Sequence, residues 1–225
     1  MTERAVFLDF DGTITARDTF VEIVRQFAPE ATARWLPPIV RGEVTLRAGI
    51  PAIVEAIASD QLPAMIALAQ AAPLRAGLPE LLDFLADRNV PVVVVSSGLA
   101  DLVRGRLGPL AVRFAGIHAM ELDRSGPRLR VVAPFAEGDE IVSKPAVLRQ
   151  YPAVEQVVVG DSITDRRMAA VAQRVFARDR LCGHCDAANI PYQRWEDFHD
   201  LRQALAAAWS EPSEATPQTK RRVPA

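Results

Sequence analysis

Two aspartates separated by one residue directly follow an apolar run in the stretch VFLDFDGTIT, residues 6–15. If extended geometry continues to the end of this strand, Asp9 and Asp11 point the same way, because strand side chains alternate between faces. At an effective dielectric constant of about 20, two carboxylates about 4 Å apart repel by roughly 4 kcal/mol. Mg²⁺ is the natural cation to offset this, since it prefers oxygen ligands and commonly bridges carboxylates and phosphates. Taken separately, each aspartate is also explained as an N-cap or turn residue.

A hydroxyl and an ammonium group follow later at positions of the same kind. The apolar strand VPVVVV ends at Ser96, whose hydroxyl could bond a phosphate oxygen. Lys144 precedes Pro145, a favoured first helical residue, so its charge would lie beside a helix N-terminus that itself attracts anions. A lone serine after a strand is usually a turn residue, and a lone lysine is usually solvated.

The strand QVVV ends in the sequence GDSITD, which holds two more aspartates. Asp161 could complete a metal site, and Asp165 could hold Lys144 or metal-bound water in place. In an open parallel sheet, ligands bind outside the carboxyl ends of the strands. The four segments in this order therefore predict one phosphate-processing site at that edge.

The hydrophobic periodicity indicates which elements position these residues. A helical pattern occupies some sixty residues after the first strand, with Asp18 as an expected N-cap and proline-bearing turns between its helices. Strand and helix then alternate, which favours a parallel sheet covered on both faces. We expect an α/β fold with a Rossmann-like parallel sheet and a small helical cap inserted after the first strand. The expected helices are 18–28, 44–58, 62–72, 77–89, 99–108, 144–151, 164–172 and 196–209, and the later strands are 90–98, 112–122, 156–162 and 174–177, with a hairpin around Ser125 and Gly126 in 123–135.

The length of 225 residues suits one core with a modest insertion. We place the core at residues 1–15 and 75–209 and the cap at 16–74. The segment 210–225 is rich in proline, serine and charge, so we expect a disordered tail there.

Composition excludes several classes of partner. A formal net charge of −2 gives no general attraction to nucleic acid or to an anionic membrane, so recognition of a phosphate must be local. No run approaches the roughly 18 apolar residues needed to cross a bilayer, and the first residues lack a signal-peptide pattern. These features favour a cytoplasmic protein. A monomer and a homodimer are both compatible with the sequence.

The only cysteines form a CxxC pair, Cys182 and Cys185, with His184 between them. A structural zinc site needs further ligands at suitable spacing, and His118 and His199 are isolated. We favour plain surface or helical positions over a metal site, with a redox pair as a third interpretation.

The ordered set of motifs resembles the phosphatases of the haloacid dehalogenase superfamily. DFDGT matches that superfamily's first motif, Ser96 the second, Lys144 the third and GDSITD the fourth. The helical insertion resembles the small cap of the phosphoserine-phosphatase-like branch. The resemblance implies a Mg²⁺-dependent phosphomonoesterase for a small phosphorylated metabolite, acting through an aspartyl-phosphate.

The same resemblance implies roles for individual residues. Asp9 would be the nucleophile, and Asp11 would act first as acid and then as base. Mg²⁺ would be held by Asp9, the backbone carbonyl of Asp11, and Asp161. The transferring phosphoryl group would be stabilised by Ser96, Lys144, Thr13 and loop amides, with Ser97 and Gly98 also contacting substrate.

The resemblance extends to the methionine-salvage phosphatase family, which acts on 2-hydroxy-3-keto-5-methylthiopentenyl-1-phosphate. It covers most of residues 5–204 and includes FARDRL and EDFHD, two segments that phosphoryl transfer does not need. Two departures stand out. Ser97 occupies a position that is usually glycine in that family, and the hairpin carries no cysteine.

Two alternatives remain. Phosphoserine phosphatase needs an acid for the substrate amine, which Asp18 could supply, and a cation for its carboxylate. The expected arginine position of the cap holds Gly49, with Arg47 two residues earlier, which favours a substrate without an amino-acid head group. Apolar Phe20, Ile23 and Phe27 would suit a thioether tail, although helical spacing makes them ordinary core residues more often. The other alternative is a non-catalytic, receiver-like phosphate-binding module.

Overall fold

Seven strands form one sheet in the order β4-β3-β2-β1-β5-β6-β7 in the computed structural model, which describes residues 2–210. All neighbouring pairs are parallel except β3 and β4, which form the expected hairpin. The strands are β1 (Thr2–Leu8), β2 (Val92–Leu99), β3 (Gly116–Asp123), β4 (Arg130–Val132), β5 (Ala153–Gly160), β6 (Arg174–Ala177) and β7 (Gln193–Arg194).

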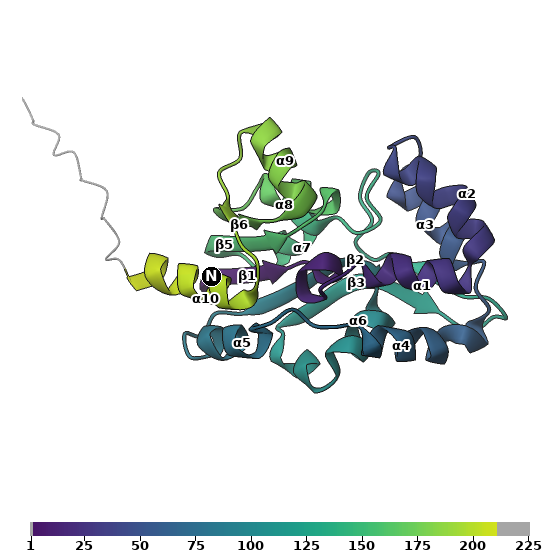
Figure 1. Cartoon of the computed structure of the whole chain (residues 1–225), viewed down its shortest axis with the longest axis horizontal. Helices are drawn as coiled ribbons and strands as arrows, with labels where there is room; N and C mark the ends of the chain where they lie inside the picture. Colours follow the sequence, from purple (N-terminus) through teal and green to yellow (C-terminus); the bar gives the residue numbers. More distant parts are fainter. Residues whose placement is uncertain (1, 211–225) are drawn as a thin grey trace, which may run out of the picture.

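β1 lies at the centre of the sheet because both of its faces are apolar. Ala5 and Phe7 are fully buried in one hydrophobic cluster, and Val6 and Leu8 are fully buried in another. An apolar run buried on both faces is typical of a central parallel strand. The first core includes side chains of α7 (Lys144–Gln150), α8 (Arg166–Ala169) and α9 (Asp179–Ala188). The second includes α5 (Leu78–Ala86), α6 (Ala100–Leu107) and α10 (Phe198–Ser210), on the opposite side of the sheet (Figure 1).

A helical insertion follows β1 and lies beyond its carboxyl end (Figure 1). It contains α1 (Thr19–Phe27), α2 (Pro29–Val40), α3 (Leu46–Val54) and α4 (Leu62–Ala71). Asp18 caps α1 as expected, because its carboxylate accepts the Val21 N–H at 2.9 Å. Short turns occupy Phe10–Ile14, Ser59–Gln61, Gly108–Arg113 and Ile163–Asp165. These observations confirm the expected α/β architecture with a small helical insertion.

The two connections between the insertion and the sheet lie side by side. Thr15 and Leu74 form an isolated antiparallel bridge, and the Ala16 N–H donates to the Pro73 carbonyl at 3.0 Å. The chain therefore leaves the sheet and returns to it at one place. We retain 16–74 as the proposed extent of the cap.

Three sequence expectations were wrong in detail. The prolines after α1 do not mark a turn, because Pro29 occupies the first turn of α2 and Pro37 and Pro38 lie near its C-terminus. Proline is tolerated in the first turn of a helix, where the N–H groups have no partner within the helix, whereas Pro37 and Pro38 each lack an N–H that the helix would otherwise use. The segment 179–188 forms a helix that is missing from the expected helices, although a helical position was one interpretation of the CxxC pair within it. Ser210 is the last residue of α10, and the rest of the expected tail, 211–225, lies outside the described residues.

Within residues 2–210, no helix is both long enough and apolar enough to cross a bilayer.

Candidate active site

The chain turns sharply after β1, and this turn presents the first aspartates. Asp9 has extended backbone angles (φ −65°, ψ 162°) and is 4% exposed. Residues Phe10–Ile14, called the β1 turn here, then form a tight turn in which the Thr15 N–H donates to the Phe10 carbonyl at 3.0 Å. Gly12 has φ +83°, and a Cβ atom there would overlap the Asp161 carboxylate. Only glycine combines that conformation with so close an approach.

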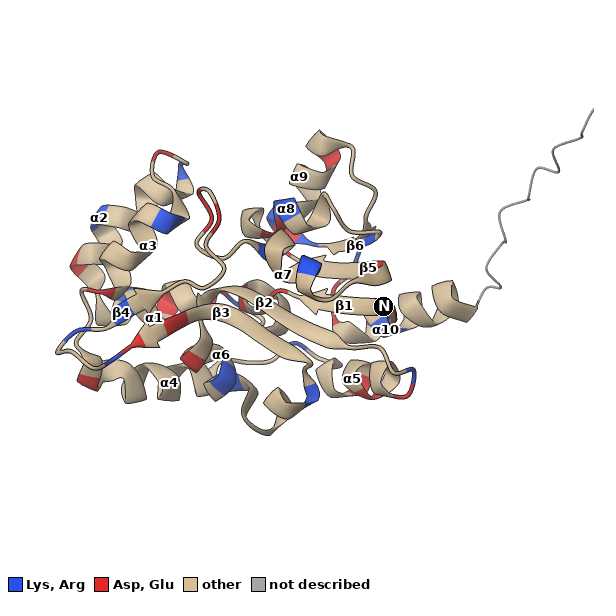
Figure 2. Cartoon of the chain, turned by 180° about the vertical axis from the view of Figure 1, so that it is seen from behind, with Lys and Arg blue, Asp and Glu red and all other residues tan. Residues whose placement is uncertain are grey.

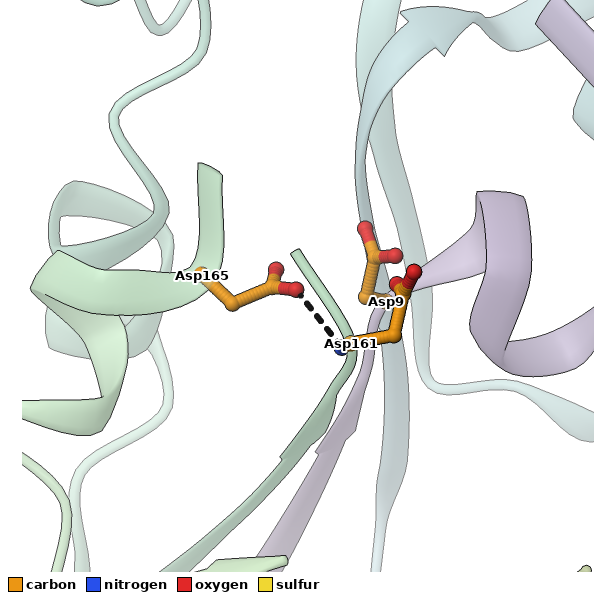
Figure 3. Close-up of side chains that lie close together, drawn as sticks. All are labelled: Asp9, Asp161 and Asp165. Atoms are coloured by element: carbon orange, nitrogen blue, oxygen red, sulfur yellow. Dashed lines mark hydrogen bonds between the residues drawn. The ribbon is translucent and has the colours of Figure 1, made fainter. Parts of the chain in front are cut away.

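Asp9, Asp161 and Asp165 form a carboxylate cluster at the carboxyl edge of the sheet. Each offers an oxygen within 4.8 Å of the others. In Figure 3 the three side chains approach one another from the end of β1, the end of β5 and the segment leading into α8. Asp165 is fixed by accepting the N–H groups of Asp161 at 3.0 Å and Ser162 at 2.9 Å. The sheet thus joins residues that are more than 150 positions apart in sequence.

Lys144 supplies the positive charge nearest to this cluster. It is 0% exposed, and its ammonium donates to Oδ1 of Asp9 and to Oδ1 of Asp165. It is the first residue of α7, and the Ser143 side chain caps that helix by accepting the Ala146 N–H. The structure therefore brings Lys144 to Asp165, as the sequence analysis considered, and also to Asp9.

Burial and like charge shift the protonation of the cluster. The pKa of Asp9 is raised to about 7, first by burial and then by the charge of Asp165. The pKa of Asp161 is raised to about 9, first by burial and then by Asp9. Although burial disfavours its charged form, the neighbouring carboxylates raise the pKa of Lys144 above its ordinary value. One ammonium thus faces three carboxyl groups, and full ionisation leaves negative charge without a partner.

The donor set fits a magnesium ion. The oxygens of Asp165 are engaged by Lys144 and by two backbone N–H groups, which leaves Asp9 and Asp161 as the carboxylates best placed to bind a metal. Hard carboxylate oxygens are the ligands that Mg²⁺ prefers, and a dication would balance the excess negative charge. The Thr13 hydroxyl donates to Oδ1 of Asp161 at 3.2 Å and so orients that side chain.

Asp11 lies outside the carboxylate cluster. Its Oδ1 accepts the Phe20 N–H at 3.0 Å, at the start of α1. Its pKa is raised well above the ordinary value, first by burial and then by the charges of Asp18 and Asp9. A Cβ atom on Gly98 would lie 3.0 Å from Oδ2 of Asp11 and 3.2 Å from the Ser96 hydroxyl, so these three residues are neighbours. Ser96 is 1% exposed, and its Oγ accepts the Gly98 N–H at 2.9 Å.

The remaining residues expected to bind substrate are more dispersed. Thr13 is fully buried and directs its hydroxyl to Asp161. Asp18 is exposed and serves as the α1 cap. Ser97 is half-buried on β2. The helix predicted for 18–28 places Ile23 fully in the core, as its spacing suggested.

Arg47 makes a contact that sequence reasoning did not foresee. It is exposed on α3 and donates from Nη1 to the Gly138 carbonyl at 3.1 Å. Gly138 belongs to residues 133–143, the acidic loop between β4 and α7, which Figure 2 shows in red between α3 and α8. Arg47 thus joins the insertion to a loop of the main sheet domain. Gly49 is buried, and a Cβ atom there would overlap Ile39 of α2.

Arg75, just after the insertion, was also missed. Its guanidinium donates to the carbonyls of Thr13 at 2.9 Å, Gly12 at 2.5 Å and Glu196 at 3.2 Å. Backbone carbonyls are available at every residue, so their choice as acceptors leaves no signature in a sequence.

The CxxC pair lies on α9. Cys182 and Cys185 are both buried, so the helical interpretation is confirmed and a surface position was wrong for the cysteines. Among the described residues, the carboxylate cluster is the one convergent group of three or more potential His, Cys, Asp or Glu ligands.

Comparison with known proteins agrees with this geometry. The family model described as haloacid dehalogenase-like hydrolase matches residues 6–170, which spans every residue of the cluster. The chain belongs to that family. It is 36% identical over 204 residues to the 2-hydroxy-3-keto-5-methylthiopentenyl-1-phosphate phosphatase of Microcystis aeruginosa (strain NIES-843 / IAM M-2473), covering 90% of this chain and 97% of that relative.

Solved structures share the fold of this chain. A phosphoserine phosphohydrolase-like protein from Francisella tularensis subsp. tularensis SCHU S4 superposes with a TM-score of 0.68 at 17% identity, covering 91% of this chain and all of that one. A phospho-aspartyl intermediate analogue of phosphoserine phosphatase superposes with a TM-score of 0.66 at 19% identity, covering 92% of this chain and 99% of that one. At these identities the likeness shows the architecture alone.

Proposed function

We propose that this hydrolase is a Mg²⁺-dependent phosphomonoesterase that forms an aspartyl-phosphate on Asp9. The observation that carries the proposal is the buried carboxylate cluster with Lys144 against it, at the edge of the sheet where ligands bind. A structural role alone does not account for three carboxyl groups gathered around one ammonium, because burying uncompensated charge is costly.

Asp9 suits the nucleophile because a carboxylate needs no base to activate it. Lys144 holds its Oδ1 and favours the ionised form. In the first step an Asp9 oxygen forms a bond to phosphorus, the ester P–O bond breaks, and the leaving oxygen takes a proton from Asp11. In the second step water attacks phosphorus, Asp11 accepts the water proton, and the Asp9–phosphorus bond breaks.

Asp11 is suited to begin as the acid. Burial and the neighbouring charges raise its pKa, which favours the protonated form that an acid needs before the ester bond breaks. The Phe20 N–H fixes one of its oxygens, and the absence of a side chain at Gly98 leaves space beside the other. Ser96, next to Asp11 and Gly98, would donate its hydroxyl to a phosphate oxygen.

Asp9 and Asp161 would hold the metal, with the Asp11 carbonyl as a further ligand. When bound, Mg²⁺ would neutralise charge on the transferring phosphoryl group. Thr13 orients Asp161 by its hydroxyl hydrogen bond, and Asp165 orients Lys144.

For the substrate we propose 2-hydroxy-3-keto-5-methylthiopentenyl-1-phosphate. The support is the 36% identity to the Microcystis phosphatase, which extends over 90% of this chain and so includes the insertion. Phosphoserine is the second candidate, because solved structures with this fold carry the name phosphoserine phosphatase and Asp18 could supply the acid that its amine needs. Gly49 argues against it, since the cap position expected to hold an arginine has no side chain, and Arg47 is engaged with Gly138.

A screen of small phosphomonoesters, with release of inorganic phosphate as the readout, tests the assignment. It should include the proposed substrate 2-hydroxy-3-keto-5-methylthiopentenyl-1-phosphate, which is an enol-phosphate, together with phosphoserine and p-nitrophenyl phosphate. Each compound is assayed with Mg²⁺ and with EDTA. We expect Mg²⁺-dependent turnover that is fastest on the enol-phosphate and absent in Asp9→Asn. Preference for phosphoserine would reject the substrate, and full activity of Asp9→Asn would reject the mechanism.

A further inference from the structure

We propose that Arg75 is a positioning residue, which fixes the β1 turn and, through Thr13, sets the orientation of the Asp161 carboxylate. The inference rests on the proposed function, because it concerns the residue that would hold the metal. It assigns a task to a side chain that phosphoryl-transfer chemistry does not itself require.

The contacts of Arg75 converge on the β1 turn. Nε donates to the Thr13 carbonyl at 2.9 Å and Nη2 donates to the Gly12 carbonyl at 2.5 Å. Two adjacent N–H groups of one planar guanidinium thus bind two successive peptide carbonyls. This fork fixes both the position and the tilt of the peptide planes, which a single hydrogen bond does not.

The β1 turn transmits this constraint to Asp161. Thr13 has no exposed surface, so its side chain follows its backbone, and its hydroxyl donates to Oδ1 of Asp161 at 3.2 Å. Gly12 lies so close that even a Cβ atom would overlap the same carboxylate. A shift of the Gly12–Thr13 peptide therefore displaces Asp161 or breaks its hydrogen bond. Groups that orient a metal ligand in this way commonly change metal affinity 10–100-fold when removed.

Arg75 is itself held by the segment that follows β7. Its guanidinium carbon lies 5.2 Å from the ring centre of Trp195, and Nη1 donates to the Glu196 carbonyl at 3.2 Å. Arg178 makes the matching pair of contacts, 5.4 Å from the same ring and 2.8 Å to the same carbonyl. Trp195 is 2% exposed, so the ring that both arginines contact is packed into the core.

This arrangement gives a physical role to EDFHD and FARDRL, which contribute Glu196 and Arg178. It also places Arg75 at the return from the insertion, since its own N–H donates to the Ile14 carbonyl at 2.9 Å. One side chain thus links the end of the insertion, the β1 turn and the C-terminal part of the core.

Arg178 provides the matched control. Arg178→Gln removes a stacking contact on Trp195 and a bond to Glu196, as Arg75→Gln does, but leaves the Gly12 and Thr13 carbonyls untouched. Arg75→Lys keeps the positive charge but cannot form the pair of hydrogen bonds to the Gly12 and Thr13 carbonyls. The readout is the rise in melting temperature on titration with Mg²⁺ alone, which gives an apparent dissociation constant without substrate turnover, together with kcat and KM on p-nitrophenyl phosphate.

We expect Arg75→Gln to weaken Mg²⁺ binding by about 10-fold or more, Arg75→Lys to be intermediate, and Arg178→Gln to stay within about 2-fold of wild type. The kcat of Arg75→Gln should be closer to the wild-type value at saturating Mg²⁺ than at low Mg²⁺. Equal Mg²⁺ affinities for Arg75→Gln and Arg178→Gln would overturn the inference while leaving the proposed function intact. A wild-type protein that neither responds to Mg²⁺ nor turns over phosphate esters would overturn both.

Discussion

Lys144→Met is the substitution for which the structure gives the clearest energetic expectation. Methionine replaces the alkyl chain of the lysine with a side chain of similar length and removes only the ammonium. Lys144 is 0% exposed and contacts two carboxylates that are almost fully buried, so the loss leaves both without their cation. Asp9 is 4% exposed and Asp165 is 0% exposed, so little solvent reaches these two carboxylates to screen their charge.

Removing one partner of a buried ion pair typically costs about 3–5 kcal/mol, because the remaining charge stays desolvated. For a protein of 150–250 residues, 1 kcal/mol shifts the melting temperature by about 2–4 °C, so we expect a decrease of roughly 6–20 °C at pH 7.5 without metal. The deficit should shrink at pH 5. There Asp9, whose pKa is already raised to about 7 by burial and Asp165, takes up a proton and ceases to be an uncompensated charge.

Urea unfolding of wild type, Lys144→Met, Asp165→Asn and the double variant measures this directly. Because Asp165→Asn removes one of the stranded charges, the double variant should be more stable than the sum of the single losses, by about 1–3 kcal/mol. The asparagine oxygen can still accept the N–H groups of Asp161 and Ser162, so the local backbone is preserved. A Lys144→Met protein within 1 kcal/mol of wild type at pH 7.5, or strictly additive variants, would refute the reasoning.

Further expectations concern the acid and the metal. Asp11→Asn keeps an acceptor for the Phe20 N–H but removes the proton donor, so kcat should fall by about 10²–10⁴. The loss should be larger for an alkyl phosphate than for p-nitrophenyl phosphate, because the leaving group of the latter needs little protonation. An equal loss on both esters would argue against the acid role. Folding raises the pKa of Asp9 from 3.8 to about 7 and of Asp161 from 3.8 to about 9, so their stabilising contribution is complete below pH 4 and is lost as pH rises through 7 and 9. Mg²⁺ binds their ionised forms, so the rise in melting temperature that it causes should grow between pH 6 and 9, and a rise independent of pH would contradict this.

The sequence predicted the main features of the site because topology brings strand ends together. Once the apolar runs before Asp9, Ser96 and Asp161 are recognised as parallel strands, their following residues must meet at one edge of the sheet. Asp18 was predictable for a local reason, since an N-cap interacts with a residue only three positions away. Contacts of this kind are encoded in short spacing or in strand order.

Other features depend on three-dimensional packing and have no local signature. The helix α2 includes Pro37 and Pro38, although each lacks the N–H that a helix would use there, so their positions alone do not predict it. The contacts of Arg47 and Arg75 join residues more than 60 positions apart and end on backbone carbonyls. Nothing in the position of Thr13 along the chain indicates that its hydroxyl would reach Asp161.

The most direct test of the account is to identify the residue that carries phosphorus during turnover. Enzyme mixed with Mg²⁺ and substrate is quenched in acid within the first turnover, digested and mapped by mass spectrometry. The account predicts a phosphoryl adduct on the peptide that contains Asp9, absent from Asp9→Asn and from samples prepared in EDTA. An adduct on another residue, or first-turnover phosphate release with no phosphoenzyme under conditions that preserve acyl phosphates, would contradict it.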